Sequence, residues 1–127
     1  MLTEYHYQTN KSFEDTIDAL KVLLMERGFG TLCTIPLSEK FNEKNLSFDG
    51  KLSILEICNP FEANQILEVN AQALYLLPCK IIVREINNVT TIHMASPTSL
   101  ASLLNDPQLI EAVQKIESTL LDAIESV

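Results

Sequence analysis

The sequence predicts an α+β fold: a curved, mostly antiparallel sheet with two long helices packed on one of its faces. Strand-like segments alternate irregularly with helical ones, and two of them read as a hairpin, which disfavours a doubly wound parallel sheet. The segments near residues 12–28 and 107–126 carry apolar residues at helical spacing. Because domains cluster at roughly 100–150 residues, we expect residues 1–127 to form a single α+β domain.

The first two elements are a strand and an amphipathic helix. Tyr5 and Tyr7 alternate with polar residues over 2–8, which is typical of a strand with one exposed face. Ser12 is a suitable N-cap for the helix, and Gly28 a suitable stop. Between them an apolar face follows at spacings of four, three and four, formed by Phe13, Ile17, Leu20 and Leu24.

The middle of the chain predicts two strands and a short helix. Residues 29–35 read as a strand that Pro36 ends, and Cys33 within it is expected to fill the core or the sheet. A polar helix or a long connection follows, then a turn at Asp49-Gly50 and a strand over 52–58. Pro60 suits the first position of a helix over 61–69, whose inward residues would be Phe61, Ile66 and Leu67.

The last third predicts a hairpin and the second long helix. Residues 79–86 and 89–95 are β-prone, and Asn87-Asn88 can supply the positive φ angles of a two-residue turn. Helical turns are expected over 99–104, and Asp106-Pro107 can open the final helix. Its apolar face runs at spacings of four, three, four and four through Leu109, Val113, Ile116, Leu120 and Ile124.

Composition and charge exclude several classes of function. Seventeen acidic against nine basic side chains give a net charge of −8, which disfavours a nucleic-acid partner. No apolar run approaches the roughly 20 residues that cross a bilayer, and no signal peptide is recognisable. The three cysteines are widely spaced and odd in number, so we expect no disulfide framework and a cytoplasmic location. From the charge and the short apolar runs, we expect neither a membrane nor a nucleic acid as a partner.

The candidate ligand-binding residues surround two prolines. Cys58 ends a strand before Asn59-Pro60, and Cys79 begins a strand after Pro78. The ends of neighbouring strands can bring side chains together at a shallow cleft, where a thiol pair or a thiol and Asn59 would bind a small ligand or a persulfide. A thiolate stabilised by Lys80 or a helix N-terminus would be nucleophilic. The alternative is structural: the cysteines are small buried hydrophobes, and Asn59 caps a helix.

A metal site is a weaker alternative. Cys58, Cys79 and His93 would form a soft-metal site if their strands are neighbours, but their spacing matches no standard zinc motif. The sequence contains no Gly-rich phosphate loop, no G-x-S-x-G and no H-E-x-x-H. We therefore expect no cofactor, and we favour a function other than catalysis.

The order of several short motifs resembles one known family. The chain contains, in sequence, Gly28-Phe29, Ile57-Cys58-Asn59-Pro60, Leu76-Leu77-Pro78-Cys79 and Ser96-Pro97. With the closing amphipathic helix, this order is similar to the domain of unknown function 302 family from about Tyr5 to the C-terminus. A Gly often precedes the Leu-Leu-Pro-Cys segment in that family, whereas residues 71–75 of this chain are Ala-Gln-Ala-Leu-Tyr, which have larger side chains.

The resemblance implies a small dimeric α+β domain of a bacterium or archaeon, with no established reaction. Together with the residues, it predicts a homodimeric, non-catalytic module that binds a small molecule or a protein. The alternative is a thiol-dependent redox or sulfur-handling protein that uses Cys58 and Cys79.

Overall fold

A computed structural model of the chain, which describes residues 2–127, contains one five-stranded sheet with the strand order β1-β5-β4-β3-β2. Every neighbouring pair of strands is antiparallel, which confirms the predicted α+β class. The strands are β1 (Glu4–Thr9), β2 (Gly30–Ile35), β3 (Lys51–Cys58), β4 (Cys79–Ile86) and β5 (Val89–Ala95). The helices are α1 (Phe13–Met25), α2 (Leu37–Glu43), α3 (Pro60–Val69), η1 (Ala71–Leu76), α4 (Pro97–Ala101), η2 (Ser102–Leu104) and α5 (Pro107–Glu125).

Local signals in the sequence set most of these boundaries. The Ser12 hydroxyl accepts a hydrogen bond from the Asp15 amide at 3.1 Å and thereby caps α1. Gly28 follows α1 with a φ of +85°, a left-handed conformation that favours glycine. Asn87 and Asn88 both have positive φ and form the predicted β4–β5 turn.

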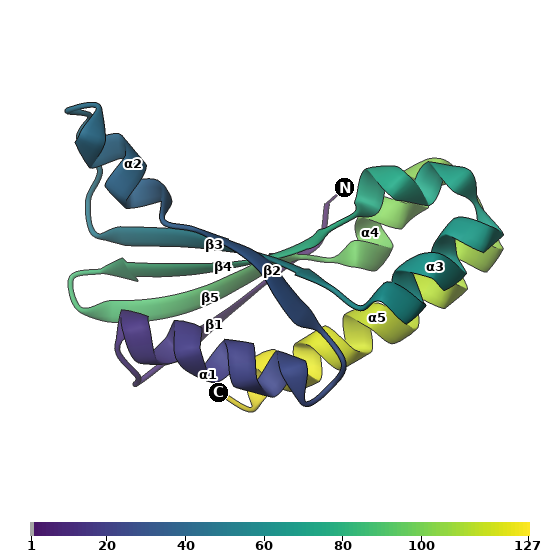
Figure 1. Cartoon of the computed structure of the whole chain (residues 1–127), viewed down its shortest axis with the longest axis horizontal. Helices are drawn as coiled ribbons and strands as arrows, with labels where there is room; N and C mark the ends of the chain where they lie inside the picture. The colour runs from purple at the N-terminus through teal and green to yellow at the C-terminus, as the bar shows by residue number, and fades with distance from the viewer. Residues whose placement is uncertain (1) are drawn as a thin grey trace.

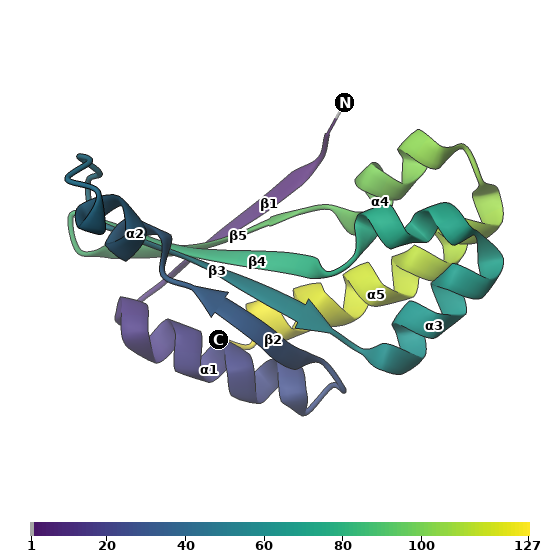
Figure 2. The same ribbon diagram turned by 45° about the horizontal axis from the view of Figure 1, so that its top comes forward.

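The two long helices lie on the same face of the sheet, as predicted (Figure 1). β1 and β2 form opposite edges, so the β1–α1–β2 connection crosses the full width of the sheet. Arg27, just beyond α1, joins the two helices through an ion pair with Asp122 of α5 at 2.8 Å. The shorter α2 lies on the other side of the sheet, at the end away from α4 (Figure 2).

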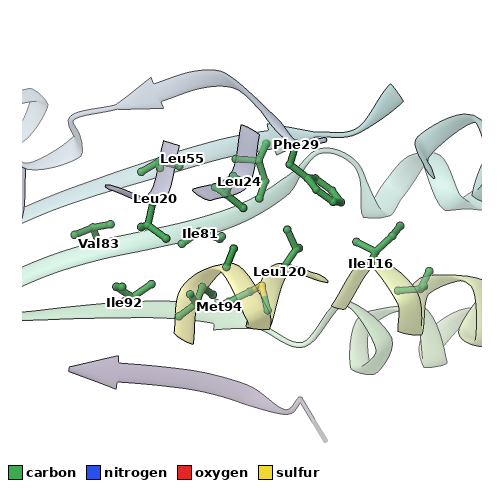
Figure 3. Packing of buried hydrophobic residues seen from close by; sticks show 14 of the residues in the cluster. Leu20, Leu24, Phe29, Leu55, Ile81, Val83, Ile92, Met94, Ile116 and Leu120 are labelled. Atoms are coloured by element: carbon green, nitrogen blue, oxygen red, sulfur yellow. The ribbon is translucent and has the colours of Figure 1, made fainter. Parts of the chain in front are cut away.

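The hydrophobic core fills the space between the sheet and these helices (Figure 3). Leu20 and Leu24 of α1 and Leu120 of α5 are fully buried, and they meet strand residues such as Leu55 and Ile92. Alternate strand residues point away from the core, as the pleat of a strand requires. The opposite face of the sheet is hereafter called the open face. No helix among residues 2–127 has the length and apolar character needed to span a membrane.

Three details differ from the sequence-based predictions. Phe61 and Leu67 do not face inward: they are 86% and 38% exposed, because both project away from the helix face that buries Ile66. Cys33 is exposed rather than buried, next to an irregularity in the β2–β3 pairing at the edge of the sheet. The apolar run after α3 forms η1, an element that periodicity did not predict.

Candidate functional site

The candidate site lies where two central strands separate. The pairing of β4 with β5 extends from the hairpin only as far as Ile82 opposite His93. Beyond this pair, β4 stays with β3 and reaches Cys79, whereas β5 stays with β1 and reaches Ala95. Figure 2 shows the two strands diverging toward α4. At this end of the sheet, β4 and β5 are therefore no longer paired with each other, and an opening lies between them.

A cavity of about 280 Å³ occupies this opening. Its walls come from both strands and from the helices around the end of the sheet, and they are mainly apolar. The lining residues are Ile66, Tyr75, Leu76, Leu77, Pro78, Cys79, Lys80, Ile82, Met94, Ala95, Pro97, Leu100, Val113 and Ile116. This volume is near the roughly 300 Å³ lower limit of ordinary ligand pockets, and it approaches twice the about 150 Å³ of an engineered cavity that holds benzene.

The cavity has a buried end and an exposed end. Ile66, Val113 and Ile116 are each at most 3% exposed and belong to helices α3 and α5. Tyr75 of η1 is 77% exposed, and Lys80 of β4 is exposed as well. An entering molecule would therefore meet a phenol and an ammonium group first and aliphatic side chains last.

One wall of the cavity is held in place by a half-buried carboxylate, that of Glu117. Pro97 and Leu100 of α4 line the cavity, and the amide of Thr98 donates a hydrogen bond of 2.9 Å to Oε1 of Glu117 on α5. The Ser96 hydroxyl donates to the same oxygen, and the Tyr5 hydroxyl donates to Oε2 at 2.8 Å. Burial raises the pKa of Glu117, but these hydrogen bonds outweigh that effect and leave the pKa lowered.

Cys79 lines the cavity, and the raised pKa of its thiol makes it a poor nucleophile. It pairs with Ile57 and packs against the core. Burial, with a smaller effect of the Cys58 thiol, raises the pKa of Cys79 to about 11. The neutral thiol is then the predominant form of Cys79 at neutral pH. The arrangement suits apolar contact with a ligand better than sulfur chemistry.

The other predicted site residues, Cys58, Asn59 and Pro60, do not line the cavity. Cys58 follows Ile57, which faces the core, so the pleat directs Cys58 to the open face, opposite to Cys79. The Asn59 side chain accepts hydrogen bonds from the amides of Phe61 at 3.0 Å and Glu62 at 3.3 Å. It is therefore the N-cap of α3, with Pro60 at the first helical position. Of the five predicted residues, Pro78 and Cys79 line the cavity, and Cys58, Asn59 and Pro60 do not.

Comparison with known proteins assigns the chain to a family. The model of the domain of unknown function DUF302 matches residues 5–127. The chain belongs to the DUF302 family. A crystal structure of an uncharacterized conserved DUF302 protein from Bacillus stearothermophilus is 38% identical in sequence, with a TM-score of 0.94 over 96% of this chain and 95% of that one. None of the curated proteins compared with the chain matches it.

The weaker metal alternative is not assembled in this DUF302 chain. His93 belongs to the open face, where its ring lies 6.0 Å from that of His6, whereas Cys79 packs against the core. The Nε2 atom of His93 is 2.8 Å from the Thr91 hydroxyl. Among residues 2–127, no three His, Cys, Asp or Glu side chains are grouped so as to hold a metal ion.

Sequence reasoning missed most residues of the DUF302 cavity. Tyr75, Leu100 and Val113 come from three separate elements, and no motif connects them. The available signal was indirect: both Pro78 and Ser96-Pro97 interrupt strands, and these interruptions lie at the point where β4 and β5 separate. Two neighbouring strands that end at prolines on the same side of a sheet predict a local opening.

Proposed function

We propose that this protein is a non-catalytic module that binds a small apolar molecule in the cavity between the separated ends of β4 and β5. The observation that carries the proposal is the cavity itself, about 280 Å³ in volume and lined mainly by aliphatic side chains. Concave sites lined mainly by apolar side chains bind apolar molecules of matching size. The expected ligand is therefore larger than benzene, with about the bulk of two fused rings.

A fluorescent probe tests this proposal directly. The chain contains no Trp, so the emission of 2-naphthalenemethanol is observed without tryptophan background. We expect saturable binding, with shifts in the NMR methyl resonances of Met94 and Ile116 at the buried end. Absence of saturable binding, or shifts confined to residues outside the cavity, would contradict the proposal.

A cavity-filling variant locates the binding. Ala95 lines the cavity at the end of β5, so Ala95→Leu places three more carbon atoms in it. We expect at least a tenfold loss of affinity for the probe, equivalent to about 1.4 kcal/mol. The matched control is Ala71→Leu, which adds the same atoms at an exposed position of η1. Equal affinity in the two variants would place the probe elsewhere.

We propose in addition that the protein is a cytoplasmic homodimer whose copies meet through the open face. Support for the interface comes from Ile35 and Ile54, which lie opposite each other on β2 and β3 of the open face and, unlike Lys80 and Ile82 of β4, do not line the cavity. Support for the compartment comes from the cysteines, all three of which are free.

The thiol-dependent alternative makes a different prediction. A redox or sulfur-handling role for Cys58 and Cys79 requires at least one thiol that reacts under native conditions. Because the pKa of Cys79 is raised to about 11, we expect Cys79 to resist iodoacetamide at neutral pH while the exposed Cys33 reacts. Rapid native alkylation of Cys79, located by mass spectrometry, would favour the alternative over the binding module.

A further inference from the structure

We infer that the ligand of this cavity is an amphiphile with an anionic head group, bound with its head at Lys80 and its apolar part toward Ile116. This inference rests on the proposed function and adds the chemical class of the ligand. It depends on the distribution of charge and exposure around the cavity, which differs sharply between the two ends.

Lys80 is the one charged side chain among the described residues that line the cavity. Its side chain is 58% exposed, and the exposed Tyr75 is a second lining residue in contact with solvent, so this end of the cavity is the polar, solvent-facing one. The opposite end is formed by Val113 and Ile116, whose surroundings offer a ligand only apolar contact. A molecule that fits both ends has an apolar body and one polar head.

The charge at the exposed end selects the sign of the head group. An ammonium donor attracts a carboxylate or another anion and repels a cation. In the structure this ammonium lies 3.6 Å from Oε1 of Glu56 on the neighbouring strand. Glu56 does not itself line the cavity, but it is already paired with Lys80, so its carboxylate would compete with an anionic head group for this ammonium.

Three probes with the same naphthalene body separate the contributions of head and body. They are 2-naphthoate, 2-naphthalenemethanol and 2-naphthylmethylammonium, which carry an anionic, a neutral and a cationic head. We expect the anion to bind about three- to fivefold more tightly than the alcohol, the range for a partly exposed ion pair. The cation should bind most weakly, and added salt should reduce the difference.

Two substitutions should change the preference in opposite directions. Lys80→Gln removes the attracting charge, so 2-naphthoate should lose its three- to fivefold advantage over the alcohol. Glu56→Gln removes the competing carboxylate, so the same advantage should increase by about twofold or more. Lys44→Gln is the matched control for Lys80→Gln, because it removes the same positive charge at an exposed position after α2.

The outcomes distinguish this inference from the proposed function. If all three probes bind equally, and Lys80→Gln behaves like Lys44→Gln, the anionic-head inference is wrong while the apolar binding site stands. If no probe binds saturably, both are wrong. A preference for the anion that Lys80→Gln abolishes and Lys44→Gln leaves intact supports the inference, and melting curves show whether each variant is folded.

Discussion

At the scale of single residues, Glu117 connects three parts of the chain through hydrogen bonds to Tyr5, Ser96 and Thr98. Glu117→Gln removes the charge that these donors stabilise. We expect the free energy of unfolding at about pH 7 to fall by about 1–3 kcal/mol, the range for a hydrogen-bonded charged group. Urea denaturation measures the change, and Glu111→Gln on the exposed side of the same helix is the control.

The same carboxylate predicts a pH dependence. The pKa of Glu117 in the folded protein lies below the ordinary value of 4.5. Its stabilisation is therefore fully present above the unfolded pKa, and it is lost as pH falls through the folded pKa. We expect the stability difference between the unchanged protein and Glu117→Gln to shrink as the solution is acidified below about pH 4. A difference that is constant across this range would contradict the assigned role.

At the scale of elements, α3 begins after its N-cap Asn59, a residue that by sequence is also a candidate for the ligand site. Asn59→Ala removes the acceptor for two amides and should cost about 1 kcal/mol of stability. Since Asn59 does not line the cavity, the affinity for 2-naphthalenemethanol should not change. Asn59→Asp, which keeps an acceptor oxygen, should retain the stability. Loss of probe binding in folded Asn59→Ala would show that Asn59 contributes to the site.

Local patterns predicted the elements because their causes are local. The Ser12 cap, the left-handed Gly28 and the Asn87-Asn88 turn each depend on a few adjacent residues, and the structure contains all three. The inward position of Phe61 was predicted from apolar character alone. Whether such a residue is covered depends on which neighbouring element passes over it, and none covers Phe61 enough to bury it.

The cavity could not be predicted in the same way, because its cause is not local. It exists because β4 follows β3 while β5 follows β1, a divergence that depends on pairing between distant parts of the chain. The prolines at 78 and 97 indicated where strands stop, but not that an apolar opening lies between them. Likewise, the sequence placed Cys58 and Cys79 at adjacent strand ends, and strand register decided that they face opposite sides.

At the scale of the whole molecule, the proposed dimer predicts a mass twice that of the 14.2 kDa chain. Ile54→Gln places a polar group beside Ile35 on the open face and should raise the dimer dissociation constant at least tenfold. Val22→Gln, an equivalent change at an exposed position of α1, is the control. Sedimentation velocity measures both, and a concentration-independent monomer for the unchanged protein would contradict the dimer.

The edge position of β1 has a consequence for how the molecule is made. β1 includes the first described strand residues of the chain, yet its only sheet neighbour is β5, which pairs with it from Thr90 to Ala95. During synthesis on the ribosome, β1 therefore remains unpaired until β5, and with it most of the chain, has emerged. The β3–β4–β5 meander, whose strands follow one another closely, can assemble earlier, because closing short loops costs less entropy. Although β1 is translated before the other four strands of the sheet, it is thus among the last of them to be incorporated.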